Sequence, residues 1–279
     1  MRNAYLLRVL KSPSGAIGAL LLLMVLLMAL SAHYFYPNGP WTMAARPYQW
    51  PMTNPGQPLG TDTLGRNILT SLLYGARISL WVGVASTLAA CVVGIAFGTL
   101  AGFYGKAVDS VLMRITDAFQ TVPSFLFAIV IVAVLTPSIG TIIFAIALVS
   151  WPMVARLMRA EVMRVKSAEF VQACRVLGMS DCRILLTQIL PNSLSPIVVA
   201  SSVLVSSAIT TEAGLAFLGL GDPNVMSWGT IVNLGRASIR TNWYIAIIPG
   251  ICILLTVLAL NMLGDAINDA GNPRLIRRR

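Results

Sequence analysis

Long segments without Asp, Glu, Lys or Arg dominate the chain and predict its membrane-spanning elements. These uncharged segments are 12–45, 78–105, 118–155, 184–211 and 241–264. Crossing a hydrocarbon core takes about 20 apolar residues, so each segment holds one helix and 118–155 holds two, divided at Pro137. The pattern predicts six spanning helices at 16–36, 79–103, 117–136, 139–158, 193–212 and 245–264. The expected fold class is an all-α membrane protein.

Composition places the chain in the same class. Hydrophobic residues make up 57% of the 279 positions, charged residues only 11%, and the mean hydropathy is +0.79. Soluble domains carry about 25% charged residues, so a water-soluble enzyme is excluded. The first apolar run, 16–35, exceeds the roughly 7–15 residues of a signal-peptide core, and we expect it to be a retained helix.

Lys and Arg set the expected orientation. The net charge of +10 would suggest nucleic-acid binding in a soluble chain, but cytoplasmic loops of membrane proteins also collect basic residues. With the N-terminus inside, 15 Lys and Arg fall on the cytoplasmic side and 5 on the other side. We therefore expect a multi-pass protein of the plasma membrane, in a bacterium the inner membrane, with both termini cytoplasmic. Its surroundings would be the lipid bilayer and not nucleic acid.

Polar segments divide the chain into two regions. Residues 1–77 would comprise a cytoplasmic tail, the first helix and an extracytoplasmic segment. Residues 78–279 would form a core of five helices. This core carries a cytoplasmic loop at 159–192 and an outer segment at 213–244.

The cytoplasmic loop predicts a short helix at 168–177. Ser167 has the side chain of a helix N-cap, and Glu169 lies in the first turn, where the helix dipole favours a negative charge. Gly178 suits the left-handed position that ends a helix. Helical spacing places one apolar stripe at Phe170, Ala173, Cys174 and Leu177.

A second short helix is expected to begin at Ser180-Asp181 and to stop at Pro191. A helical hairpin that presents small apolar residues fits a groove on another protein. The alternative is a hairpin that lies on the lipid headgroups.

The loop resembles that of a known family. Glu169-x-x-x-Ala173-Cys174-x-x-x-Gly178, followed by Ile189-Leu190-Pro191, is similar to the EAA motif of ABC importer permeases. In that family the motif forms the coupling helix that docks into the ATPase subunit. The resemblance implies this ATPase-coupling role for Glu169, Phe170, Ala173, Cys174, Gly178 and Asp181. Cys174 replaces the second alanine of the motif, and Ile189 lies one place later than in the consensus; cysteine is small enough to pack like alanine.

Flanking motifs narrow the resemblance to the dipeptide, oligopeptide and nickel branch, and to its shorter C-type permease. They run from about residue 8 to 275 and include Pro58-Leu59-Gly60-Thr61-Asp62, Glu212-Ala213-Gly214 and Ser227-Trp228-Gly229. The resemblance implies a type I ABC importer permease fold. It also implies a complex with a second permease, two ATP-binding subunits and an extracytoplasmic substrate-binding protein.

ATP hydrolysis is expected to occur in the partner subunits. A Walker A loop needs a Gly-Lys pair followed by Ser or Thr, but Gly105-Lys106 is followed by Ala107. The chain would therefore be no enzyme and would hold no cofactor, with ATP and Mg²⁺ bound by the ATPases. His33 on its own supplies no ligand set, so we expect no metal site.

Charged and aromatic residues outside the loop are further candidates. Glu212 ends the fifth predicted helix, where it would contact the substrate or act as a gate; solvation at a helix end is the alternative. The outer segments offer contacts for a binding protein at Arg66, Arg77 and Trp228. The alternative is that these segments pack against the partner permease.

Arg114 and Asp117, spaced i and i+3, are expected to pair on one helix face. Because this pair would lie at the cytoplasmic end of the third predicted helix, we interpret it as structural and not as a proton relay.

Two other functions compete with an ABC importer permease for peptides or related small polar solutes. A self-sufficient secondary transporter would need ionisable residues near mid-span, and the uncharged segments leave none there. The same ABC complex with nickel chelates, other metal chelates or opines as cargo stays open, because the binding protein sets specificity in this branch.

Overall fold

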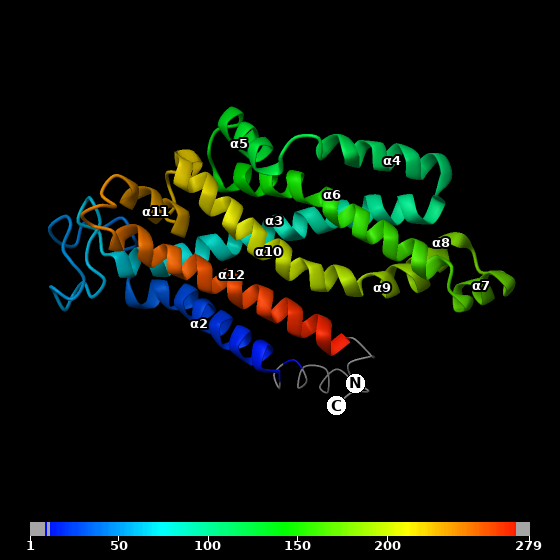
Figure 1. Ribbon diagram of the computed structural model, residues 1–279, viewed down its shortest axis with the longest axis horizontal. Coiled ribbons are helices and arrows are strands. Elements are labelled where there is room, and N and C mark those ends of the chain that lie inside the picture. Colours follow the sequence, from blue (N-terminus) through cyan, green and yellow to red (C-terminus); the bar gives the residue numbers. More distant parts are fainter. Residues whose placement is uncertain (1–8, 10–11, 272–279) are drawn as a thin grey trace.

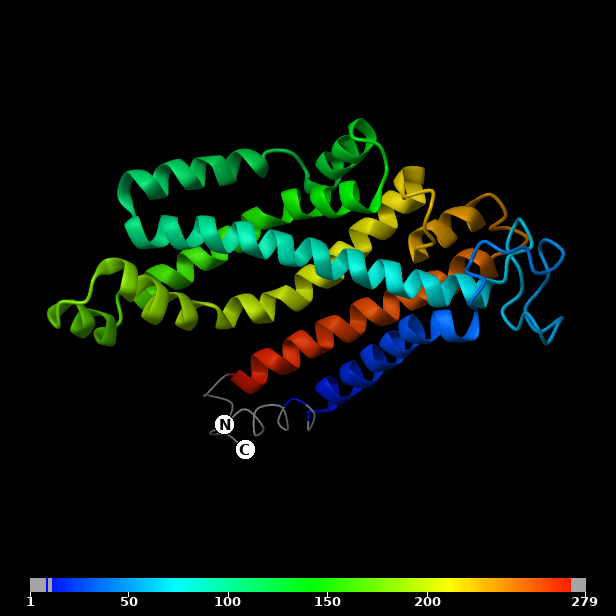
Figure 2. The ribbon, with the colours of Figure 1, turned by 180° about the vertical axis from the view of Figure 1, so that it is seen from behind.

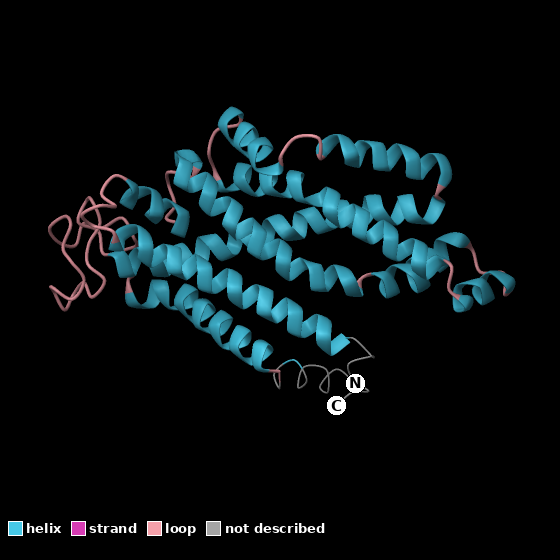
Figure 3. Ribbon diagram, in the orientation of Figure 1, coloured by secondary structure: helices cyan, strands magenta, loops and turns pink. Residues whose placement is uncertain are grey.

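The structure is a computed structural model that describes residue 9 and residues 12–271 (Figure 1). The described residues form helices joined by loops, the longest of which is 36–67, and contain no β-strand (Figure 3). In chain order the helices are α2 (Pro13–Phe35), α3 (Ile68–Tyr104), α4 (Lys106–Phe119), α5 (Ser124–Val134), α6 (Ile139–Lys166), α7 (Glu169–Val176), α8 (Asp181–Ile184), π-helical η1 (Leu185–Ile189), α9 (Leu190–Ser193), α10 (Ser195–Leu215), π-helical η2 (Ala216–Leu220), α11 (Trp228–Arg236) and α12 (Tyr244–Gly271).

Five helical segments of the described chain are long and apolar enough to cross a membrane, which confirms five of the predicted spans. They are α2, α3, α6, α10 with η2, and α12. The third predicted span, 117–136, is not one helix. It is a pair, α4 and α5, bent by 75° across residues 120–123, and counting this pair as one span gives six.

The break in the third span has a local cause. Pro123 has no N–H for the helix ladder, and its ring pushes the preceding residue out of the helical region. Pro123 itself has a non-helical ψ of 126°, and α5 begins at the next residue. Hydropathy alone hides this break, because the residues on both sides of it are uncharged.

Several spanning helices are longer than predicted. Helix α3 begins at Ile68, where the side chain of Asn67 accepts a hydrogen bond from the Leu69 N–H at 2.9 Å. The division between residues 77 and 78 therefore lies inside a continuous helix. Helix α6 continues to Lys166, well into the predicted loop 159–192. The predicted spans stop next to Arg77 and Arg159, because these charged residues interrupt the apolar pattern, although they lie inside α3 and α6.

Helices α3 and α6 form the most extensively packed pair among the described helices. Three glycines of α3, Gly94, Gly98 and Gly102, recur every four residues and face α6 directly. A Cβ built on Gly98 would lie 2.4 Å from the carbonyl oxygen of Ala155. Such small-residue repeats let membrane helices bring their backbones into contact, so α3 and α6 form a closely packed central unit (Figure 2).

The long axis of the molecule has two distinct ends. One end carries the 36–67 segment and α11, and we call it the α11 end (Figure 1). The opposite end carries α7 and α8, and we call it the α7 end (Figure 2). Candidate functional residues lie at both.

Candidate functional site

Helix α7 begins one residue later than the sequence predicts. Its N-cap residue is Ala168, whose side chain cannot accept a hydrogen bond, and Ser167 instead ends α6 and donates its hydroxyl to the Arg164 carbonyl at 2.9 Å. The prediction of Ser167 as the N-cap is therefore wrong. Glu169 is the first residue of α7, as predicted, and its negative charge there interacts favourably with the helix dipole.

The predicted role of Gly178 in ending α7 is confirmed. Gly178 has φ +80°, in the left-handed region that glycine adopts without strain. Its N–H donates to the Arg175 carbonyl at 2.9 Å, and the Met179 N–H donates to the Cys174 carbonyl at 3.1 Å. These two bonds form a Schellman motif, which fixes the direction of the chain after α7.

Helix α7 has one attached face and one free face. Val171 is fully buried and Cys174 half-buried against an apolar cluster from the α7 end, which includes Val162, Val165, Ile184, Leu185 and Ile189. The other face exposes apolar side chains: Phe170, Ala173, Val176 and Leu177. Cys174 thus borders the predicted stripe, and Val176, 88% exposed, joins it. Sequence reasoning missed Val176.

The second helix of the hairpin begins at Asp181, after Ser180, as predicted, and Asp181 is exposed. The predicted stop at Pro191 is wrong, because the chain continues as η1 and α9 through Pro191. A π-helical turn is a usual way to accommodate an irregularity in a helix. Side chains also bond to carbonyls of this turn: the Asn192 amide to Gln188 at 2.6 Å, and the Ser193 hydroxyl to Ile189 at 2.9 Å.

Ion pairs connect the C-terminal half of α6 to α4. Arg159 donates two hydrogen bonds of 2.5 Å to the Asp109 carboxylate, and Arg156 donates to Asp117 at 2.6 Å. The predicted pairing of Arg114 with Asp117 is wrong, since Asp117 pairs across helices instead. The helix that ends next to α7 is therefore held to α4 by charge-assisted bonds, the stronger class of hydrogen bond.

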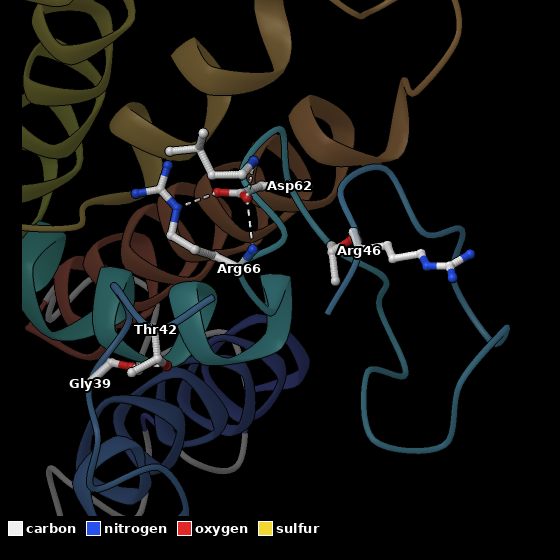
Figure 4. Close-up of polar contacts among 7 residues, drawn as sticks. Gly39, Thr42, Arg46, Asp62 and Arg66 are labelled. Atoms are coloured by element: carbon white, nitrogen blue, oxygen red, sulfur yellow. Dashed lines mark hydrogen bonds and ion pairs between the residues drawn. The ribbon is translucent and has the colours of Figure 1, made fainter. Parts of the chain in front are cut away.

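Arg66 lies inside the 36–67 segment. Its Nε donates to Asp62 Oδ2 at 2.7 Å, while Asp62 Oδ1 accepts the backbone N–H groups of Leu64 and Arg66 at 2.8 and 2.9 Å (Figure 4). The guanidinium also lies 5.1 Å from the Trp41 ring centroid. Both charges are buried, so we correct the expectation that Arg66 contacts a binding protein directly. Arg46 is exposed and points away from this pair (Figure 4).

Trp228 is also buried, at the junction of α3 and α11. Its indole N–H donates to the Leu72 carbonyl at 3.0 Å, and its backbone N–H donates to the Ser79 hydroxyl at 3.3 Å. Gly75 leaves room for the indole, because a Cβ there would lie 2.8 Å from Trp228 Cδ1. The expectation of a docking contact at Trp228 is therefore corrected as well.

Glu212 belongs to the same junction. Its side chain is 2% exposed, and its carboxylate accepts a 3.3 Å hydrogen bond from the Ser79 hydroxyl. This burial contradicts the alternative that Glu212 is solvated at a helix end, while a role in the pathway or as a gate stays a prediction. Arg77 is exposed on α3, and its docking role stays a prediction too.

These features together define a class of protein. The chain is a multi-pass membrane subunit in which a short helix, with a free apolar face, is fixed between two spanning helices.

Comparison with known proteins gives the family. Residues 94–277 match the family described as "Binding-protein-dependent transport system inner membrane component", and the chain belongs to this family. It is thus a permease subunit of an ABC importer, a class that works with ATPase and substrate-binding partners.

Curated relatives share most of their length with the chain. The di/tripeptide transport system permease protein DppC of Pseudomonas aeruginosa is 39% identical, over 94% of this chain and 88% of the relative. The dipeptide permease DppC of Haemophilus influenzae is 37% identical, over 95% and 92%. The glutathione transport system permease protein GsiD of Pectobacterium atrosepticum is 36% identical, over 96% and 89%.

Solved structures show the fold. A chain of the inward-facing methionine ABC transporter MetNI superposes with a TM-score of 0.60 at 17% identity, over 72% of this chain and 97% of that chain. The type I ABC importer permease fold is therefore confirmed.

Proposed function

We propose that the chain is one of two permease subunits of an ATP-driven peptide importer. A second homologous permease forms the other half of the pathway, two ATP-binding subunits hold ATP and Mg²⁺, and an extracytoplasmic protein delivers the substrate. The α7 end faces the cytoplasm, and both termini lie on that side. The excess of Lys and Arg in the segments at this end supports the orientation.

The observation that carries the proposal is the free apolar face of α7. Leu177 is 81% exposed and Val176 88% exposed, although Val171 on the attached face of the same helix is fully buried. Exposed apolar side chains on a fixed helix mark a contact surface, and a helix laid in a groove is a common mode of recognition. We assign this face to the ATP-binding subunit.

Attachment of α7 to α6 suits the transfer of motion. Lys166, at the end of α6, contacts the Phe103 carbonyl and lies 5.4 Å from the Phe103 ring, which links the base of α7 to α3. Displacement of α7 by an ATPase therefore acts on the α3–α6 unit, and rigid-body rocking of helices is how such transporters alternate access.

Peptides are the proposed cargo because several relatives are named for di- and tripeptides, dipeptides and glutathione. Nickel or metal chelates and opines are the alternative. Membership of the family replaces the competing interpretation as a self-sufficient secondary transporter.

The coupling assignment is tested with substitutions in α7 of the complete transporter. Ala173→Arg places a charge in the free apolar face, and Gly178→Pro removes the N–H that ends the helix. Both variants should insert normally and lose uptake. Gln172→Arg adds the same charge to an exposed polar position beside this face and should retain uptake. Normal uptake by Ala173→Arg would refute the assignment.

Crosslinking provides an independent test. Ala173→Cys, in a background where the native cysteines are replaced by alanine, should crosslink to an ATP-binding subunit. Failure to capture that subunit, while Gln172→Arg and wild type transport normally, would contradict docking at α7.

A further inference from the structure

Helix α10 carries a face of hydroxyl groups in an otherwise apolar span. Its hydroxyl residues toward the α11 end are Ser206, Ser207, Thr210 and Thr211, and Asn261 of α12 joins them. All five line a cavity of about 520 Å³ beside α10, together with Phe125 and Gly214. A second cavity, of about 400 Å³, adjoins it at Phe125, Ser207 and Thr211 and reaches the break between α4 and α5.

Most hydroxyl groups of this face donate their proton within the chain, so their oxygen atoms are left to accept hydrogen bonds. Thr210 and Thr211 each donate to the carbonyl four residues earlier, at 2.9 Å. The single hydroxyl proton of Ser206 faces two acceptors, the Val203 carbonyl at 2.8 Å and Asn261 Oδ1 at 2.9 Å. Each oxygen then keeps a lone pair for an incoming N–H donor. The Asn261 amide N–H₂ is left as a donor for a carbonyl oxygen.

The side-chain hydroxyl of Ser207 has no hydrogen-bond partner within the part of the chain that the structure describes, although the Ser207 carbonyl accepts the Thr211 hydroxyl. Serine in a membrane helix ordinarily bonds back to a carbonyl of the preceding turn, as Ser201 does to Val198 at 2.6 Å. The free hydroxyl lines both cavities, so it is available to a molecule that enters either one.

The lining has the chemistry of a weak site for an amide. None of the residues that line the two cavities is charged. A peptide bond presents one N–H and one C=O, which match the hydroxyl acceptors and the Asn261 amide. A pathway must also release what it binds, and uncharged partners satisfy this need because their hydrogen bonds contribute less than charged ones.

We propose that Ser206, Ser207, Thr210, Thr211 and Asn261 form a site that binds the main chain of a peptide during its passage. This inference rests on the proposed function, because it needs a second permease to cover the open side of the cavities. The site would bind the main-chain amide groups of the peptide and would not select among its side chains.

Thiol labelling tests access to the site. In the complete reconstituted transporter, with the native cysteines replaced by alanine, Ser207→Cys should react with the membrane-impermeant cationic reagent MTSET. A loaded binding protein and a dipeptide, added with ATP, should slow this reaction at least severalfold. Arg164→Cys, at a charged position near the end of α6 that is 66% exposed and outside both cavities, is the control and should be labelled without protection.

Removing single hydroxyl groups tests their contribution. Ser207→Ala and the isosteric Thr211→Val should each lower dipeptide uptake per ATP hydrolysed roughly twofold to tenfold, the range for one neutral hydrogen bond. Ser201→Ala, on the same helix and outside the cavities, should leave uptake unchanged.

The outcomes separate the two proposals. If ATP hydrolysis responds to the loaded binding protein, but Ser207→Cys is not labelled or Ser207→Ala behaves like Ser201→Ala, this inference is wrong and the proposed function stands. If wild type shows no such response in the assembled complex, the proposed function fails and the inference fails with it.

Discussion

Gly98→Ala probes the contact between α3 and α6 most directly. The added Cβ would lie 2.4 Å from the Ala155 carbonyl oxygen and 2.7 Å from Met158 Cβ. Ordinary contacts begin near 3.4 Å, so α6 must move by about 1 Å. Gly94 and Gly102 make similar contacts one turn away on each side, and they prevent α6 from pivoting to relieve the clash.

The expected magnitude follows from overpacking. Adding a methyl group to a well-packed contact costs about 1–3 kcal/mol. Replacing a helical glycine by alanine also contributes about 1 kcal/mol in the opposite direction. Gly250→Ala shows the second effect alone, because Gly250 lies in α12 with no atom within 4 Å of its added Cβ. The propensity gain is common to both variants and cancels in their difference.

The assay is thermal unfolding of the purified transporter in detergent, and size-exclusion chromatography measures the fraction that stays folded after heating. Gly98→Ala should melt below Gly250→Ala by about 2–4 °C for each kcal/mol of difference. Equal melting temperatures for the two variants would refute the backbone contact between α3 and α6.

Three further predictions concern buried or paired charges. Asp109→Ala and Arg159→Ala should show a coupling free energy of about 1 kcal/mol in a double-mutant cycle of unfolding, and strictly additive effects would contradict their pairing. Asp62→Ala leaves a buried arginine unpaired and should cost about 3–5 kcal/mol; faster proteolysis of the 36–67 segment is the readout, and an unchanged cleavage rate would count against it. Glu212→Leu removes the acceptor of a buried hydroxyl and should cost about 1–3 kcal/mol in thermal unfolding, whereas Glu212→Gln should retain most stability. Equal losses for both would disprove the hydrogen bond.

Periodicity and charge predicted the spanning helices and the shape of the coupling hairpin. Gly178 was predictable because a left-handed residue after an apolar stripe has few alternatives to glycine. The break before Pro123 was missed, because the uncharged flanks dominate a hydropathy pattern, although proline carried the signal. Pro191 shows the opposite error, since it lies at the start of α9, directly after η1, where a helix tolerates a residue without an N–H.

The burial of individual side chains was harder to predict from the sequence than the positions of the helices. Arg66 and Trp228 looked like surface contacts because outer segments of a membrane protein are polar and exposed on average. Asp62, four residues before Arg66, was the available signal for an ion pair. Burial of Trp228 depends on Gly75, far away in the sequence, and a single sequence does not show that contact.

Two π-helical turns lie on either side of α10: η2 follows it directly, and η1 precedes it with the short α9 between them. A π turn holds one residue more than an α turn, and one residue corresponds to about 100° of helical rotation. A deletion in a regular α-helix therefore turns all the residues after it by this angle, whereas a π turn that loses one residue can return to α geometry. Deleting the exposed Leu186 from η1 should accordingly leave Ser207 facing its cavities, whereas deleting a residue inside α10 before Ser207 would turn it away from them.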